Sequence, residues 1–437
     1  MTTPPLHLPS GINYECTRCG RSCGEFWEIK VEPEIADSIR NRPAEALREA
    51  GAADPSSPVV PSPWTPGTLM MRPGPDGHCC LQGADGLCTL HKIFGFASKP
   101  NRCRTFPYRF IETPRGTYCG LTFACSAVLN NQGPAVADQR GEIEDLFGWT
   151  LSRRAVEAPN ELASGIPLTW EQYEAVEQDL ADLLEPALAP IGERLLMQYH
   201  YLHLLIKLVR ADRENTSRQF DGPEANTQAI EVFRHRVREG DWALLRGIAG
   251  RRPKSGLLRR MILGFAHALR NTYGRRSGRL SGYAMVLKTY FTHGFGHGSI
   301  DMPALGKPVA YRKMKTIGFD PARPEFDELL TRYFRHRIQR KDLLLADSVQ
   351  FGLQLQLLHW GLIHWYAAAL AADRGAHEVG WEHLTEAVRI VEKYFVLHST
   401  FDQLFKRMPL LRLFLDRLLE HPLYAFTMAR GEWCERQ

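Results

Sequence analysis

The chain has 437 residues, more than one hydrophobic core usually serves, so we expect two or three domains. Its composition, 44% hydrophobic and 24% charged, is typical of a soluble globular protein. The net charge of +5 is too small to imply nucleic-acid binding by itself.

The chain begins with MTTPPLHLPSG, which lacks the basic stretch and apolar run of a secretory signal peptide. In the reducing cytosol disulfides are disfavoured, and clustered thiols there are more often metal ligands or redox groups. We therefore expect a cytoplasmic protein that carries a thiolate site.

Residues 1–135 are rich in Pro, Gly and Cys and contain short apolar runs such as FWEIKV and GLTFAC. This pattern favours short strands and loops that something other than a large core holds together. Within it, residues 51–67 form a predicted Pro/Ser loop. We assign residues 1–135 to a cysteine-cluster metal-binding domain and the loop-like residues 136–168 to a linker.

From Thr169 onward the pattern is helical. Thr169 and Gln172 form a predicted capping box, and a second long helix is predicted over residues 192–214. Two apolar stripes with helical spacing follow, made of Phe326, Leu329, Leu330, Tyr333 and Phe334, and of Leu384, Val388, Val391, Phe395 and His398. Strands and helices do not alternate, which argues against a doubly wound sheet. We predict a mainly α fold: an irregular, metal-stapled N-terminal domain with short strands, and an all-α domain over residues 169–437.

Residues 348–372 contain no charged side chain and are long enough to span a bilayer. However, glutamines and histidines in this stretch, among them His359 and His364, would need polar partners in hydrocarbon. We therefore predict a helix buried inside the protein and no membrane partner. His359 and His364 are predicted to be core histidines with satisfied hydrogen bonds.

The cysteines are strongly clustered, since nine of the ten fall between Cys16 and Cys125 and only Cys434 lies elsewhere. Four separate segments each supply thiols, several of them in turn-forming contexts. Thiolates that converge from loops suit zinc or an iron–sulfur cluster, and such a site would staple a region with few core residues. Nine ordinary buried cysteines would be an unusual alternative at this density.

The identity of the metal stays open at this point. Four thiolates close one zinc site and eight close two, whereas a 4Fe-4S cluster needs four and leaves spares. The opening spacing C-x2-C-x3-C reverses the C-x3-C-x2-C of radical enzymes that cleave S-adenosylmethionine, and no barrel pattern accompanies it. It also departs from the ferredoxin spacing, which disfavours simple electron transfer.

The order C-x2-C-x3-C, then C-x8-C from Cys79 to Cys88, then CRTFP from Cys103, resembles the YkgJ-type cysteine-cluster proteins, described as zinc- or iron-chelating domains. Within that group the chain is most similar to flagellin lysine N-methylase, which shares a Trp-x-Ile after the first cluster, here Trp27 to Ile29. The family usually has adjacent cysteines where this chain has Ser22-Cys23-Gly24. Cys119 or Cys80 is then the candidate for the missing thiol. The metal ligands implied by the resemblance are Cys16, Cys19, Cys23, Cys79, Cys88, Cys103 and Cys125, with Cys119 as the replacement.

The resemblance implies a methyltransferase that carries methyl groups from S-adenosylmethionine to surface lysines of a protein substrate and contains an iron–sulfur cluster. Methyl transfer to an amine depends mainly on proximity and alignment. The sequence has no independent adenosylmethionine motif and identifies no catalytic residue. The alternative is a non-catalytic protein in which zinc or iron holds the fold or serves iron handling.

Residues 242–300 contain no acidic side chain but eleven Arg and Lys residues, including Arg259 and Arg260. A solvated basic face is the simplest interpretation. The functional alternative is a surface for an acidic protein partner or an anionic cofactor. Nucleic acid is disfavoured because no aromatic-studded binding motif accompanies the charge.

Overall fold

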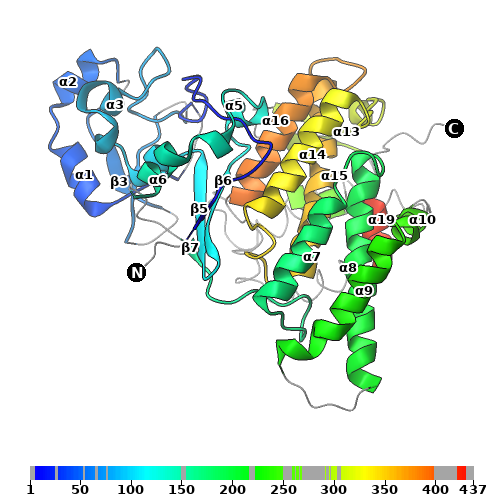
Figure 1. Ribbon diagram of the computed structural model, residues 1–437. Coiled ribbons are helices and arrows are strands. Elements are labelled where there is room, and N and C mark those ends of the chain that lie inside the picture. The colour runs from blue at the N-terminus through cyan, green and yellow to red at the C-terminus, as the bar shows by residue number, and fades with distance from the viewer. Residues whose placement is uncertain are drawn as a thin grey trace. The chain divides into compact units, whose positions relative to one another are not determined.

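The computed structural model divides the chain into two compact units, Met1–Val156 and Glu157–Gln437 (Figure 1). The division falls inside the stretch predicted to be a linker. The structure describes residues 5–24, 28–52, 55–63, 67–74, 77–148, 154–215, 222–249, 258–260, 262–264, 266–267, 291, 295, 297–302, 307–397 and 421–429.

A four-stranded sheet forms one part of the first unit. Its strands are β1 (Leu6–His7), β6 (Gly116–Leu121), β5 (Tyr108–Thr113) and β7 (Arg154–Ala155), in that order. β5 and β6 are an antiparallel hairpin, whereas β1 and β7 join its two edges in parallel. Gly116 allows the close approach of β1, because a Cβ there would lie 2.4 Å from the carbonyl oxygen of Pro5.

A three-stranded antiparallel sheet forms the other part, in the order β2 (Lys30–Val31), β4 (Leu69–Met71), β3 (Val59–Pro61). The prediction that residues 51–67 form only a loop is therefore wrong. Val59 and Val60 are β-branched and pair with Met71 and Met70 of β4, while Pro61 ends the strand at the sheet edge. Pairing to a strand further along the chain overrode the local Pro/Ser signal.

Short helices complete the first unit. They are α1 (Pro33–Arg40), α2 (Ala44–Glu49), α3 (Thr89–Phe94), α4 (Asn101–Thr105), α5 (Ser126–Leu129) and α6 (Arg140–Gly148), with 3-10 turns η1 (Phe96–Ser98) and η2 (Val136–Asp138). A small core of Val31, Ile39, Leu47, Met71 and Leu90 packs α1, α2 and α3 against β3 and β4. η2 and α6 lie within residues 136–168, so this stretch is not loop throughout.

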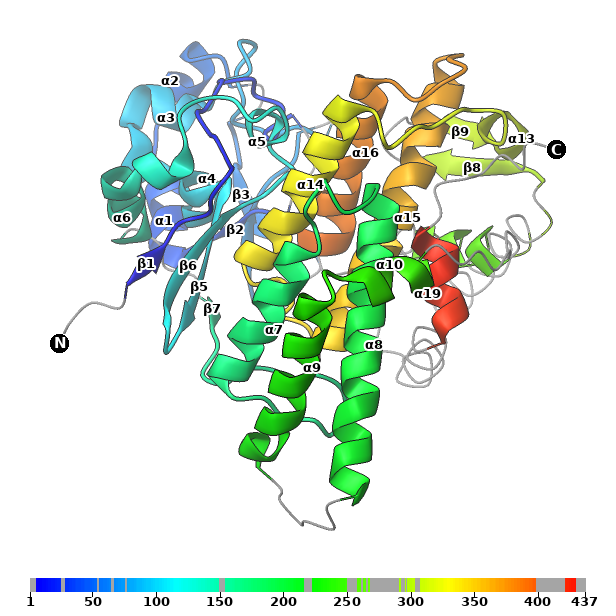
Figure 2. The same cartoon turned by 45° about the vertical axis from the view of Figure 1, so that its right-hand side comes forward.

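The second unit is built from longer helices (Figure 2). They are α7 (Trp170–Asp182), α8 (Ile191–Asn215), α9 (Thr227–Glu239), α10 (Ala243–Ala249), α13 (Tyr311–Met314), α14 (Pro324–Gln339), α15 (Val349–Asp373), α16 (Trp381–Val391) and α19 (Pro422–Ala429), with a 3-10 turn η3 (Pro223–Asn226) and a π-helical turn η4 (Glu392–Leu397). The capping box at Thr169 is confirmed, as is the helix predicted over residues 192–214. The stripe from Phe326 to Phe334 is buried on α14, while His398 of the other stripe lies outside the described residues.

α15 is the buried helix that the uncharged stretch predicts. Nearly all its side chains are buried, and it packs against α8, α16 and α19. Trp360 donates a hydrogen bond of 3.0 Å to the carbonyl oxygen of Ala429 in α19. Among the described residues, no helix combines the length and apolarity needed to cross a membrane.

The prediction of an all-α second domain is wrong in one place. β8 (Ser299–Met302) and β9 (Lys307–Ala310) form an antiparallel hairpin beside α13, as Figure 2 shows. Ile300 pairs with Val309, both β-branched, and Gly298 precedes the hairpin with a φ of +96°, which few other residues adopt. Two four-residue strands are too short to give a periodic signal in the sequence.

Candidate metal centre

The first cysteine segment runs between two anchor points in the first unit. At one end, the Tyr14 amide donates to the carbonyl oxygen of Pro134 at 3.0 Å, and Gln139 Nε2 donates to the carbonyl oxygen of Tyr14 at 2.9 Å. At the other end, the amide of Cys79 donates to the carbonyl oxygen of Cys23 at 2.9 Å. The main chain therefore fixes Cys16 near the β5–β6 side of the unit and Cys23 beside Cys79.

Gln82 holds the turn between these cysteines. Its Nε2 donates to the carbonyl oxygens of Gly20, at 2.8 Å, and Gly86, at 3.0 Å. Gly20 has a φ of +63°, and a Cβ there would lie 2.3 Å from the Gly86 carbonyl oxygen. Glycine is thus required for the loop of Cys16 to Cys23 to approach the turn that leads to Cys88.

Cys88 and Cys103 are each placed by a short helix. Cys88 is the residue before α3, and its main chain bridges to Gln82. Cys103 lies within α4, whose first amide, that of Asn101, donates to Glu32 Oε2 at 3.1 Å. Both thiols are partly buried, like those of Cys23 and Cys79.

We call four of these thiols the inner group: Cys23, Cys79, Cys88 and Cys103. Charges within this group affect the pKa values of its members. Burial raises the pKa of Cys23 to about 12, and the charges of Cys79 and Cys88 add to the shift. The pKa of Cys103 is also raised, first by burial and then by the other three thiols. The charges of Cys79, Cys23 and Cys88 thus oppose the ionisation of Cys103, and a bound cation would favour the ionised form of these thiols.

Three further thiols, Cys16, Cys19 and Cys125, form what we call the outer group. Burial raises the pKa of Cys125 to about 11, and Cys19 and Cys16 contribute to the rise. The pKa of Tyr14 is raised by burial and then by the charges of Cys125 and Cys16. Cys19 acts on thiols of both groups, since it also raises the pKa of Cys23.

Cys119 and Cys80 belong to the hydrophobic interior. Cys119 lies in β6 opposite Phe110, is 1% exposed, and has its pKa raised by burial alone. The Cys80 thiol is fully buried in the small core and donates to the carbonyl oxygen of Pro58 at 3.8 Å, and its interaction with the neighbouring Cys79 thiol is the main cause, ahead of burial, of the raised pKa of Cys79. The structure therefore does not bring Cys119, the expected replacement for the missing thiol, into either group.

Among the described residues, no three Cys, His, Asp or Glu side chains converge closely enough to hold a metal ion. What fits a metal is the chemistry of the donors: four half-buried thiols from three segments, which would carry clustered negative charge once ionised. Soft thiolates select zinc or iron–sulfur clusters over hard cations. A bound metal would neutralise the repulsion that acts between the thiolates without it.

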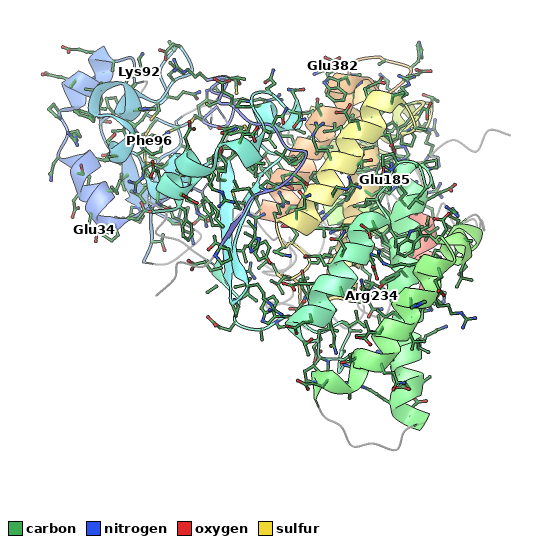
Figure 3. The ribbon with its side chains drawn as sticks, viewed as in Figure 1. Glu34, Lys92, Phe96, Glu185, Arg234 and Glu382 are labelled. Carbon is green, nitrogen blue, oxygen red and sulfur yellow. The ribbon has the colours of Figure 1, made fainter. Side chains whose placement is uncertain are left out.

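Lys99 is a further charged residue of the site, and the sequence did not predict it. Its ammonium lowers the pKa of Cys23, Cys88 and Cys103, although burial outweighs this effect at each thiol. The Lys99 Nζ also lies 5.5 Å from the ring centre of the exposed Phe96, which is labelled with Lys92 in Figure 3. A lysine four residues before a cysteine carries no recognisable spacing signal, so only the fold identifies it.

Trp27 and Cys434 lie outside the described residues. No family model matches the chain, and comparisons with curated proteins and with solved structures give no match either. The likeness to flagellin lysine N-methylase therefore rests on the cysteine spacing and the neighbouring residues.

Proposed function

We propose that the first unit binds a thiophilic metal, as a 4Fe-4S cluster or as zinc, through the inner group Cys23, Cys79, Cys88 and Cys103. One observation carries the proposal. Segments far apart in the sequence meet where the Cys79 amide donates a hydrogen bond to the Cys23 carbonyl oxygen, and the charges of Cys79, Cys23 and Cys88 raise the pKa of Cys103. Four thiolates are the number that closes either kind of site. The bound metal would clamp the loops of a unit whose apolar core is small.

Metal content tests this proposal directly. Anaerobically purified protein should contain iron and sulfide, with visible sulfide-to-iron absorption, or else stoichiometric zinc without colour. Cys103→Ala should lose the metal, whereas Cys119→Ala, which removes a buried thiol from β6, should keep it. Equal metal content in the two variants would refute the inner group as the ligand set.

We further propose that the whole protein is an S-adenosylmethionine-dependent protein lysine methyltransferase of the flagellin lysine N-methylase type. Its support is the resemblance over residues 14–127. In this proposal the metal unit accompanies a second unit that contributes to binding the methyl donor or the protein substrate. The competing proposal is a non-catalytic metal protein, in which the thiolate site serves the fold or iron handling.

Binding of the methyl donor separates the two proposals. Calorimetry of the metal-loaded protein with S-adenosylmethionine should give saturable binding if the protein is a methyltransferase. A metal-loaded, folded protein that binds no methyl donor would leave the non-catalytic metal protein as the function.

A further inference from the structure

The segment of the first unit that connects Cys88 to Cys103 exposes apolar side chains. Ile93 of α3 is 40% exposed, and Phe96 of η1 is 39% exposed (Phe96 is labelled in Figure 3). Phe94, which lies between them in the chain, is half-buried and packs against the small core. The segment therefore turns one aromatic side chain inward, where it stabilises the unit, and the next one outward.

Two cationic side chains lie on the same surface as Phe96. The Lys99 Nζ is 5.5 Å from the Phe96 ring centre, and the His91 ring meets Phe96 in a T-shaped contact with ring centres 6.0 Å apart. The pKa of His91 is lowered, first by burial and then by the charges of Lys99 and Arg18, so both cations lie near that ring. We call this surface the α3 patch, made of His91, Ile93, Phe96, Lys99 and Arg18.

The α3 patch carries positive charge. Residues 86–111 contain five Arg and Lys side chains and no Asp or Glu. Lys92 is paired with Asp85 at 2.6 Å, which compensates the charge of that lysine. Lys99 and Arg18, in contrast, form no ion pair with any residue that the structure describes. An acidic partner would therefore complement the charge of the patch.

The α3 patch also adjoins the proposed metal ligands. Cys88 is the residue before α3, and Cys103 lies in α4, four residues after Lys99. The charge of Lys99 lowers the pKa of both thiols and of Cys23. A molecule bound on the patch would thus contact the chain that holds these ligands.

We propose that the α3 patch is a docking surface for an acidic segment of a protein partner, in which carboxylates flank an apolar side chain. The carboxylates would face Lys99 and Arg18, and the apolar side chain would pack on Phe96 and Ile93. A nucleic-acid backbone fits less well, because it binds through several phosphate contacts and these two cations are too few. The inference goes beyond the proposed function and does not depend on which metal the inner group binds.

Peptide selection tests the docking surface. Peptides enriched from a random library displayed on phage, with the full-length protein as the target, should combine Asp or Glu with an aromatic or aliphatic residue. In fluorescence anisotropy, Arg18→Glu and Phe96→Ala should each weaken the binding of a labelled enriched peptide by about fivefold or more. The matched control is Arg48→Glu, the same charge change at an exposed position of α2, which should weaken binding by about twofold or less.

The metal content of every variant is measured alongside, so that loss of the metal is not mistaken for loss of docking. Enriched peptides without acidic residues, or equal affinity of wild type and Phe96→Ala, would overturn the proposal. Binding of labelled single-stranded DNA through Arg18, or a dimer of the chain that requires Phe96, would also overturn it, because the patch would then serve nucleic acid or a second copy. If Arg18→Glu fails to fold or loses its metal, Phe96→Ala decides.

Discussion

The two units differ in the interactions that stabilise their folds. The longest helix of the first unit, α6, has 9 residues, whereas α8 and α15 of the second unit have 25 residues each. α15 is buried almost throughout and carries an apolar core that includes Trp360 and Trp365. The first unit instead joins short strands and turns by main-chain hydrogen bonds such as Cys79 to Cys23.

The two units also differ in how their buried charged groups are compensated. In the second unit Asp179 of α7 is fully buried and accepts hydrogen bonds from Tyr201, at 2.5 Å, and from Arg234, at 2.7 Å, as well as from Arg238 (Arg234 is labelled in Figure 3). In the first unit burial and then the other inner thiols raise the pKa of Cys23 and of Cys103, and the charge of Lys99 opposes the rise. Asp179 is thus compensated by arginines of its own unit, whereas the inner thiols, once ionised, would need the cation proposed above.

Metal removal should have the largest effect and should be confined to the first unit. A structural thiolate site contributes on the order of 10 kcal/mol to folding in small metal domains, more than a core as small as this one supplies. We expect a chelator, or Cys103→Ala, to abolish hydrogen-exchange protection of the β2–β4–β3 sheet and leave α8 and α15 protected. If hydrogen-exchange protection were the same with and without metal in both units, the metal would not stabilise the first unit in particular.

Breaking the Arg340 ion pairs should destabilise the second unit strongly. Arg340→Met leaves Glu392 buried without its partner, which costs about 3–5 kcal/mol. The matched control is Arg335→Met, whose ion pair with Glu185 at 3.1 Å lies at the surface and should contribute about 0–1 kcal/mol. Denaturant unfolding followed by tryptophan fluorescence would measure both, and similar losses would contradict the assignment of Arg340 to a buried network.

Acid should destabilise the second unit through its buried histidines. The pKa values of His200, His359 and His364 are lowered, first by burial and then by His203, Arg337 and Arg259 respectively, that of His200 to about 4. Since the unfolded chain binds these protons below about pH 6.5 and the folded protein does not, the free energy of unfolding is largest above that pH. It should fall below pH 6.5, by about 1.4 kcal/mol per pH unit for each histidine.

His200→Gln tests the size of this slope. The variant should lose one proton of uptake between pH 6.5 and about 4, which is visible as a shallower dependence of the unfolding free energy on pH. An unchanged slope in His200→Gln would mean that this ring is not held neutral.

Sequence could predict what depends on neighbouring residues. The stripe on α14 follows from helical periodicity, the capping box from Thr169 and Gln172 three residues apart, and the buried helix α15 from a long stretch without charge. The strand β3 could not be predicted, because its pairing with β4 overrides the local Pro/Ser signal. The hairpin β8–β9 could not be predicted either, because two strands of four residues give no periodic signal. Cys119 shows the same limit for the site: its residue type suggested a ligand, but the β5–β6 register places it opposite Phe110.

The positions of Cys23 and Cys79 were predictable only as a tendency to converge. Their main-chain hydrogen bond depends on Gly20 and on Gln82, neither of which carries a metal-site signal. The burial of Arg259 could not be foreseen either, since the basic stretch 242–300 predicts a solvated face, whereas Arg259 lies buried with its Nη2 2.9 Å from His364 Nδ1.

The smallest expected effect concerns the side-chain cap at the N-terminus of α7. Thr169 Oγ1 accepts from the Gln172 amide at 3.2 Å, and Gln172 Oε1 accepts from the Thr169 amide at 3.0 Å. Thr169→Ala should therefore cost about 1 kcal/mol in urea unfolding, and Thr169→Ser should restore most of it. A loss in Thr169→Ser equal to that in Thr169→Ala would show that the methyl group, and not the hydroxyl, stabilises α7.

In the first unit, the helices α3 and α5 that begin next to a cysteine lack such a side-chain cap. Cys88 and Cys125 occupy the N-cap positions of α3 and α5 without capping through their side chains. Cys88→Ser puts a hydroxyl where a cap can form, so it should stabilise the metal-free unit by a few tenths of a kcal/mol to about 1 kcal/mol. The same variant should destabilise the metal-loaded unit, because a ligand is lost. Opposite signs in the two states, measured by hydrogen exchange at α3, would mean that Cys88 stabilises the unit as a ligand and not as a cap. Equal signs would remove Cys88 from the inner group.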